Sequence, residues 1–63
     1  MEEYKWEDTV MTIRDVYSGI DDYTLPAFSL GSVVCQVPDS SVVLADFDEA
    51  GIRTLNLKDV VKI

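Results

Sequence analysis

The chain contains no histidine and only one cysteine, Cys35. Without histidine it lacks the side chain that most often moves protons or binds metals near neutral pH, which leaves catalysis to carboxylates or to this thiol. A single thiol cannot form an internal disulfide. Because no basic residue lies beside Cys35 in the sequence, we expect a buried packing role rather than a nucleophile. The sequence therefore predicts a protein that is not an enzyme and uses no cofactor.

Long apolar runs are also missing. No segment approaches the roughly 18 consecutive apolar residues that read as a membrane-spanning helix. Residues 1–8 have neither the basic start nor the apolar stretch of a signal peptide. These two absences predict a cytoplasmic location and no membrane partner.

Basic residues are scarce. Five Lys and Arg stand against twelve Asp and Glu, for a net charge of −7. Nucleic-acid affinity depends on clustered basic side chains, so direct DNA or RNA binding is not expected. The acidic residues have two possible roles: they keep a small domain soluble, or they attract a basic partner.

The chain has 63 residues, of which 48% are hydrophobic. A chain of this size buries only about 60% of its unfolded surface, which allows one domain at most. We expect one domain over residues 1–63, with residues 1–8 as an N-terminal arm. With no disulfide available, a closed barrel or a partner is the expected source of stability.

Apolar alternation and β-branched residues predict five strands. We place them at residues 9–16, 32–37, 42–47, 52–57 and 61–63. Residues 17–28 form a long first loop, residues 38–41 and 48–51 form tight turns, and residues 58–60 form one helical turn before the last strand. Gly51 is expected to adopt a positive φ. This order predicts an all-β fold, a small five-stranded SH3-like barrel.

The alternation also predicts which side chains are buried. Val33, Cys35 and Val37 are expected to share an inward face, and Trp6, Tyr17, Tyr23 and Phe28 to pin the arm and the long loop onto the barrel. The expected core consists of Val33, Cys35, Val43, Ala45, Phe47, Leu55, Leu57 and Val60.

Three segments carry a resemblance to a known family: LPAFSLGSVV at residues 25–34, ADFDEAG at residues 45–51 and TLNLKDV at residues 54–60. Together they resemble small bacterial SH3-like barrel proteins, which share a Gly-x-Val-Val strand, an Asp/Gly turn and a closing Leu-x-Leu. The resemblance covers roughly residues 8–63. It implies the barrel fold and a general binding role rather than a reaction.

Residues 46–51 have the acidic spacing with which a calcium loop begins. The fifth position is Ala50, and Leu57 occupies the twelfth position, where a bidentate acid is needed. The sequence therefore predicts a solvated acidic turn and no metal site.

The function that we expect is binding of another protein, in which the long loop and the acidic turn contact the partner. Loops on a rigid scaffold are where recognition residues most often lie. One alternative is an inhibitor, of the kind that a phage or mobile element would carry, whose phosphate-mimicking acidic surface blocks a nucleic-acid-binding protein. Another is an accessory subunit of a larger enzyme complex. The candidate partner-binding residues are Tyr17, Asp21, Asp22, Tyr23, Asp46, Asp48 and Glu49.

Overall fold

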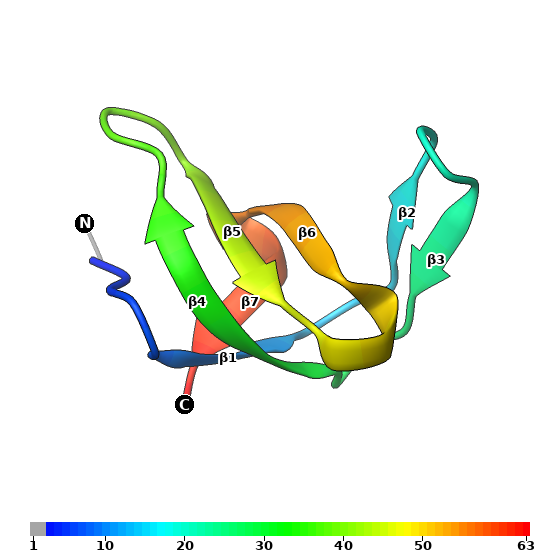
Figure 1. The fold of residues 1–63 in the computed structure, drawn as a ribbon, viewed down its shortest axis with the longest axis horizontal. Coiled ribbons are helices and arrows are strands. Elements are labelled where there is room, and N and C mark those ends of the chain that lie inside the picture. The colour runs from blue at the N-terminus through cyan, green and yellow to red at the C-terminus, as the bar shows by residue number, and fades with distance from the viewer. Residues whose placement is uncertain (1–2) are drawn as a thin grey trace.

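The computed structural model describes residues 3–63 and confirms the all-β prediction, with strands and short 3-10 turns but no α-helix in that range. Figure 1 shows the arrangement. The strands are β1 (Thr9–Thr12), β2 (Val16–Ser18), β3 (Tyr23–Leu25), β4 (Leu30–Gln36), β5 (Val42–Asp46), β6 (Ile52–Asn56) and β7 (Val60–Lys62). The 3-10 turns are η1 (Asp48–Ala50) and η2 (Leu57–Asp59).

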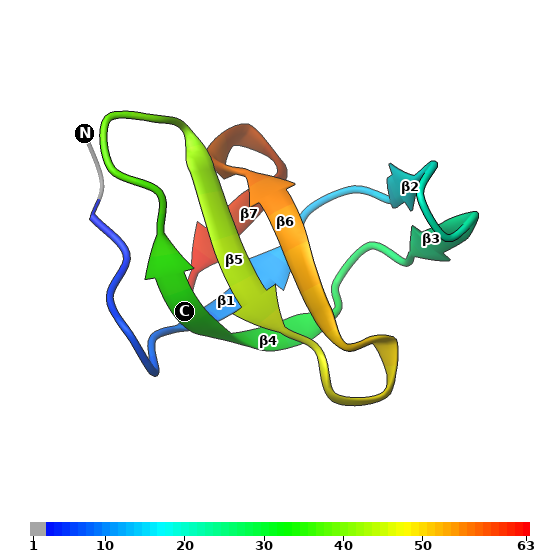
Figure 2. The same ribbon diagram turned by 45° about the horizontal axis from the view of Figure 1, so that its top comes forward.

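Five of the strands form one antiparallel sheet in the order β6-β5-β4-β1-β7. The sheet bends strongly, so that β1 and β7 pass behind β5 and β6 (Figure 2). β6 and β7 are its two edges and do not pair with each other within residues 3–63. The sheet is therefore not closed into a barrel by hydrogen bonds, in contrast to the expected closed barrel.

The predicted first strand, residues 9–16, is too long, because β1 ends at Thr12. The fully buried Thr12 side chain donates a hydrogen bond to the Pro26 carbonyl at 2.9 Å and accepts one from the Ser29 N–H at 2.9 Å. The backbone of Thr12 also bonds to Phe28 and Ser29. These bonds occupy the polar groups of the buried Thr12 at the point where the chain leaves the sheet.

The predicted long loop contains a second, two-stranded sheet. β2 and β3 pair from Val16 opposite Leu25 to Ser18 opposite Tyr23. Each strand has only three residues, too few for an alternating pattern to distinguish them from a loop. We refer to residues 16–25 as the hairpin.

The prediction that Cys35 is buried is wrong, and a β-bulge explains why. Val33 lies opposite Ala45, but Cys35 lies opposite Leu44, so β4 contains one extra residue at this point. An extra residue shifts the inward and outward positions that follow it. Val33 before the bulge is buried, whereas Cys35 and Val37 after it are exposed.

The core lies between the two halves of the bent sheet. Six of the eight predicted core residues are buried, and Leu57 is partly buried against them. Sequence analysis did not anticipate Tyr4, Val10 and Leu25. The buried apolar set is Tyr4, Val10, Leu25, Val33, Val43, Ala45, Phe47, Leu55 and Val60.

The prediction of aromatic pins is also wrong for Trp6, Tyr17 and Phe28, which are 71%, 64% and 70% exposed. Tyr4 fixes the N-terminal arm instead. Its N–H donates to Gln36 Oε1 at 2.9 Å, and Lys62 Nζ lies 5.1 Å from the centre of its ring. The Lys62 ammonium also donates to the Glu3 carbonyl.

The short turns agree with expectation to within one residue. η1 fills the connection between β5 and β6, and Gly51 after it has φ 76° and ψ −166°, which confirms the predicted positive φ. η2 begins at Leu57 rather than at Lys58, with the Asn56 side chain accepting from the Lys58 N–H at 3.0 Å. Phe47, just before η1, packs against Gly31 so closely that a Cβ there would lie 2.7 Å from its ring.

Candidate functional site

The hairpin stands apart from the five-stranded sheet, on the side where β6 forms the edge (Figures 1 and 2). Residues 46–51, which we call the acidic turn, connect β5 to β6 at the same end of the molecule. Five of the seven predicted site residues line two surface grooves at this end, Asp46 lines a hollow beside them, and Asp22 lies in the hairpin turn. The long loop and the acidic turn therefore lie at one end of the fold.

Arg53 on β6 joins these parts. Its two terminal nitrogens contact the two carboxylate oxygens of Asp21, Nη1 at 2.9 Å and Nη2 at 2.8 Å. Its guanidinium carbon lies 4.5 Å from the centre of the Tyr23 ring, and Nε donates to the Ala50 carbonyl at 2.9 Å. A planar guanidinium suits such a bidentate, stacked arrangement. Arg53 thus ties the hairpin to the edge strand and to the acidic turn.

The Asp21–Arg53 pair changes the titration of both groups. The hydrogen bond from Arg53 lowers the pKa of Asp21 below its ordinary 3.8. The same bond raises the pKa of Arg53. Asp21 therefore keeps its charge at neutral pH, but that charge is matched by Arg53.

A second bond ties the strands of the hairpin to its turn. The Tyr17 hydroxyl donates to Asp22 Oδ1 at 2.9 Å, and Asp22 has a φ of 51°. Aspartate tolerates this left-handed conformation better than most residues. The ring of Tyr17 stays 64% exposed, so the bond orients a tyrosine that still faces solvent.

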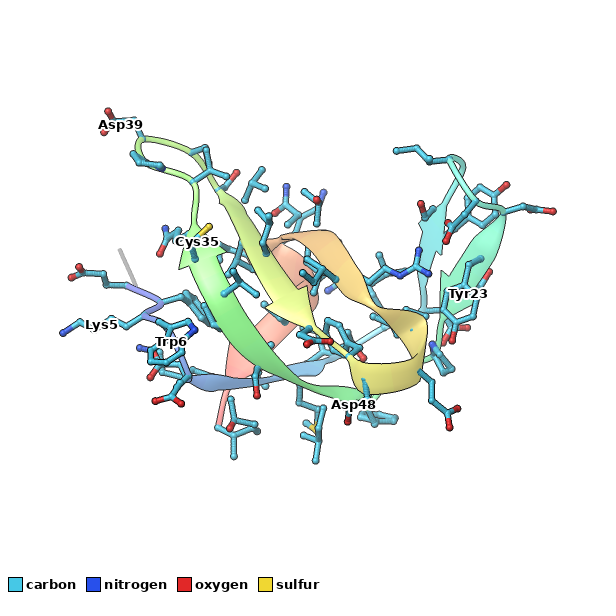
Figure 3. All side chains as sticks on the ribbon, in the orientation of Figure 1. Lys5, Trp6, Tyr23, Cys35, Asp39 and Asp48 are labelled. Atoms are coloured by element: carbon cyan, nitrogen blue, oxygen red, sulfur yellow. The ribbon has the colours of Figure 1, made fainter. Side chains whose placement is uncertain are left out.

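Two grooves flank the hairpin. The first, which we call the turn groove, brings together Tyr23, Asp48 and Glu49 over Leu25 and Ala50. Figure 3 shows Tyr23 and Asp48 at this end of the molecule, with Asp39 at the opposite end. The groove therefore brings Tyr23 of the hairpin beside two adjacent acidic residues of the distant acidic turn.

The second, which we call the edge groove, lies between the hairpin and β6. It is lined by Tyr17 and Asp21, and also by Ile20, Ile52 and Thr54. Asp46 lies in neither groove but shares a shallow hollow with Asp48 beside β4. The predicted residues therefore form a surface with several faces rather than a single cavity.

The charge at this end is strongly negative. The hairpin and residues 46–53 carry five acidic residues, Asp21, Asp22, Asp46, Asp48 and Glu49, and one basic residue, Arg53. Five negative charges and one positive charge leave a net charge of −4. Arg53 was not among the predicted site residues, although it is the only basic residue in either segment and therefore the one that can pair with their acids.

The described residues 3–63 contain no group of three or more Cys, Asp or Glu side chains that could hold a metal ion. In the acidic turn, Asp46 Oδ1 accepts the Asp48 N–H at 3.0 Å, an ordinary turn bond. Across this same range no helix has the length and apolar character to cross a membrane.

Searches with this chain found no match to a protein-family model, to a curated protein or to a solved structure.

Proposed function

We propose that this chain is a non-enzymatic SH3-like module that binds another protein through the hairpin and the acidic turn. The order of its elements supports the SH3-like assignment. The first strand, β1, is followed by the long segment that contains the hairpin and then by a three-stranded meander formed by β4, β5 and β6. A 3-10 turn, η2, then leads to the last strand, β7, which lies beside β1. Such a scaffold carries its recognition residues on the connections between strands.

One observation carries the proposal: Tyr23 of the hairpin lines the same groove as Asp48 and Glu49 of the acidic turn. A tyrosine provides a large contact area with few rotatable bonds, and aromatic residues are enriched at interfaces. The neighbouring carboxylates favour a basic partner and steer its approach. This is the combination expected of a surface that recognises a protein.

The partner's charge follows from the electrostatics of this end. With a net charge of −4 on the hairpin and residues 46–53, a basic surface is attracted and an acidic surface is repelled. Because these charges are exposed, the attraction weakens as salt screens it.

The test is a comparison of two triple variants. The first changes Asp21→Asn, Asp22→Asn and Tyr23→Ala at the proposed surface. The second is a matched control, Trp6→Ala, Glu7→Gln and Asp39→Asn, which also removes one exposed aromatic ring and two negative charges, but away from the hairpin and the acidic turn.

Wild-type protein is immobilised, a binding protein is captured from cell extract and purified, and its affinity for each variant is measured. We expect at least a tenfold loss for the hairpin variant and little change for the control, with both variants folded by circular dichroism. Equal losses in the two variants would show that total charge, not this surface, causes binding.

The same purified partner also distinguishes a module that recognises a protein surface from a nucleic-acid mimic. A mimic occupies the groove that binds DNA or RNA, so polynucleotide would displace it from the partner. A module that recognises a protein surface would stay bound when polynucleotide is added at constant ionic strength.

A further inference from the structure

The hydrogen-bond pattern of β6 shows which backbone groups face outward. The Phe47 N–H donates to the Gly51 carbonyl at 3.0 Å, and the Leu57 N–H donates to the Ser41 carbonyl at 2.8 Å. These pairs bracket the ladder between β5 and β6, in which hydrogen-bonded and non-hydrogen-bonded pairs alternate. Because the two kinds of pair alternate inward from both of these hydrogen-bonded pairs, the pairs of Arg53 and Leu55 with β5 are also hydrogen-bonded. Arg53 and Leu55 therefore direct their N–H and carbonyl groups toward β5. The intervening residues, Ile52, Thr54 and Asn56, point theirs away from the sheet.

No strand covers this outer edge within residues 3–63. β6 is the last strand of its sheet, and the hairpin forms a separate sheet that meets β6 through the side chains of Asp21, Tyr23 and Arg53. Proteins usually protect an edge with proline, lysine or a covering segment. β6 has no proline or lysine, and Asp21 pairs with its single charged residue, Arg53.

The edge groove beside these backbone groups has apolar walls. Ile20 on the hairpin is 100% exposed, and Ile52 on β6 is 60% exposed. Together with Val16 and Tyr17, they line a groove that also includes Thr54, so two of the three β6 residues with outward backbone groups border it. Exposed apolar side chains gathered around an open strand edge indicate an interaction surface.

Charge decides which occupant fits. A second copy of this chain would bring another −7 to the complex, and the end that carries the groove already has a net charge of −4. Like charges brought face to face cost binding energy, whereas Lys and Arg side chains would be attracted. The occupant is therefore a basic segment of a different protein.

We infer that the outer edge of β6 binds an extended segment with alternating apolar and basic residues, which adds to the sheet as a further strand. This inference rests on the proposed function and specifies how that surface holds its partner. Backbone hydrogen bonds to Ile52, Thr54 and Asn56 supply affinity. Apolar side chains enter the edge groove, and basic side chains on the other face of the added strand meet the acidic end.

The probe is an acetylated and amidated octapeptide of alternating valine and lysine, with a valine and glutamate octapeptide as its charge control. Amide hydrogen exchange is followed residue by residue in the isotope-labelled protein. We expect the lysine peptide to slow exchange at Ile52, Thr54 and Asn56 at least tenfold, and the glutamate peptide to have no effect. The inference would be overturned if exchange at these amides were already slow in the free protein and sedimentation showed a dimer. That result would mean that a second copy of this chain covers the edge of β6.

Backbone pairing is tested separately by N-methylating the lysine peptide at every second residue, in each of the two possible frames. Methylation removes the N–H groups that a strand needs, so at least one frame should abolish protection. Equal protection by both methylated peptides would overturn strand addition.

On the protein side, Thr54→Pro removes an outward N–H, and Thr54→Val is the matched control that keeps it. Proline is tolerated where the lost N–H faces outward from an edge strand. We expect Thr54→Pro to weaken peptide binding at least fivefold relative to Thr54→Val, with melting temperatures compared first. If Thr54→Pro does not fold, the methylated peptides decide the question. If a captured partner distinguishes the two triple variants but binds both Thr54 variants equally, strand addition is wrong and the proposed function stands.

Discussion

Gly31 on β4 lies against the ring of Phe47 and leaves no room for a larger side chain. A Cβ on Gly31 would lie 2.7 to 2.9 Å from three atoms of the Phe47 ring, which is held in place by burial. Gly31→Ala should therefore destabilise the fold by about 1–3 kcal/mol through overpacking. Gly19→Ala is the control, because its Cβ would meet only Tyr17 at 3.8 Å. Urea denaturation measures both changes.

Phe47 itself provides the second half of this test. Phe47→Ala should cost about 3–5 kcal/mol, because the ring is nearly fully buried. In that background the ring no longer opposes a Cβ at Gly31, so adding Gly31→Ala should cost much less than it does in the wild type. Additive costs would show that the penalty at Gly31 comes from elsewhere.

Cys35 shows why residue burial could be predicted only in part. Alternation predicted Val33, Val43, Ala45 and Phe47 correctly, since each lies in a regular stretch or immediately after one. It failed at Cys35 because one extra residue in β4 reverses the faces, and no sequence signal marks this bulge. A bulge depends on how the neighbouring strand pairs, which a local pattern does not contain.

The bulge predicts the reactivity of the thiol. Because Cys35 is exposed, it should react with a water-soluble disulfide reagent in the native protein at a rate close to that of the urea-unfolded chain. The reaction is followed by absorbance. A thiol that stays unreactive until urea unfolds the protein would place Cys35 back in the core.

At the scale of elements, the longer strands were predictable and the hairpin was not. β5 and β6 each differ by a single residue from the expected strands, because alternation and flanking turn residues define them. β2 and β3 are only three residues long, and side-chain bonds hold the hairpin in place, including those of Asp21 and Tyr17. The contact of Asp21 with Arg53 joins residues that are 32 positions apart, so it leaves no local pattern.

The hairpin should loosen in acid, because Asp21 must stay ionised to hold Arg53. The pKa of Asp21 is lower in the folded protein than its ordinary 3.8. A lowered pKa gives stabilisation that is present above the unfolded value and lost as the pH falls through the folded value. The stability difference between wild type and Asp21→Asn should therefore be constant above about pH 5 and shrink below about pH 4. Denaturation at several pH values measures it, and a difference that grows on acidification would contradict this role.

For the whole molecule, the sequence could nominate the site residues and place the long loop near the acidic turn, but it could not give the contacts that join them. Tyr23, Asp48 and Glu49 were chosen because they lie on or beside connections, and they line one groove. Arg53 was not chosen, because its role depends on the hairpin folding beside β6. Barrel closure was also expected, yet β6 and β7 remain separate edges in the described range. Which strands pair is decided by the whole chain, so closure could not be derived from local alternation.

Whether the hairpin and the acidic turn form the partner-binding surface can be measured by the change in backbone amide chemical shifts when the captured, purified partner is added to isotope-labelled protein. We expect the largest changes in residues 17–23 and 46–54. Unchanged shifts in those residues, with the largest changes around Trp6 and Asp39, would place the binding surface elsewhere (Figure 3).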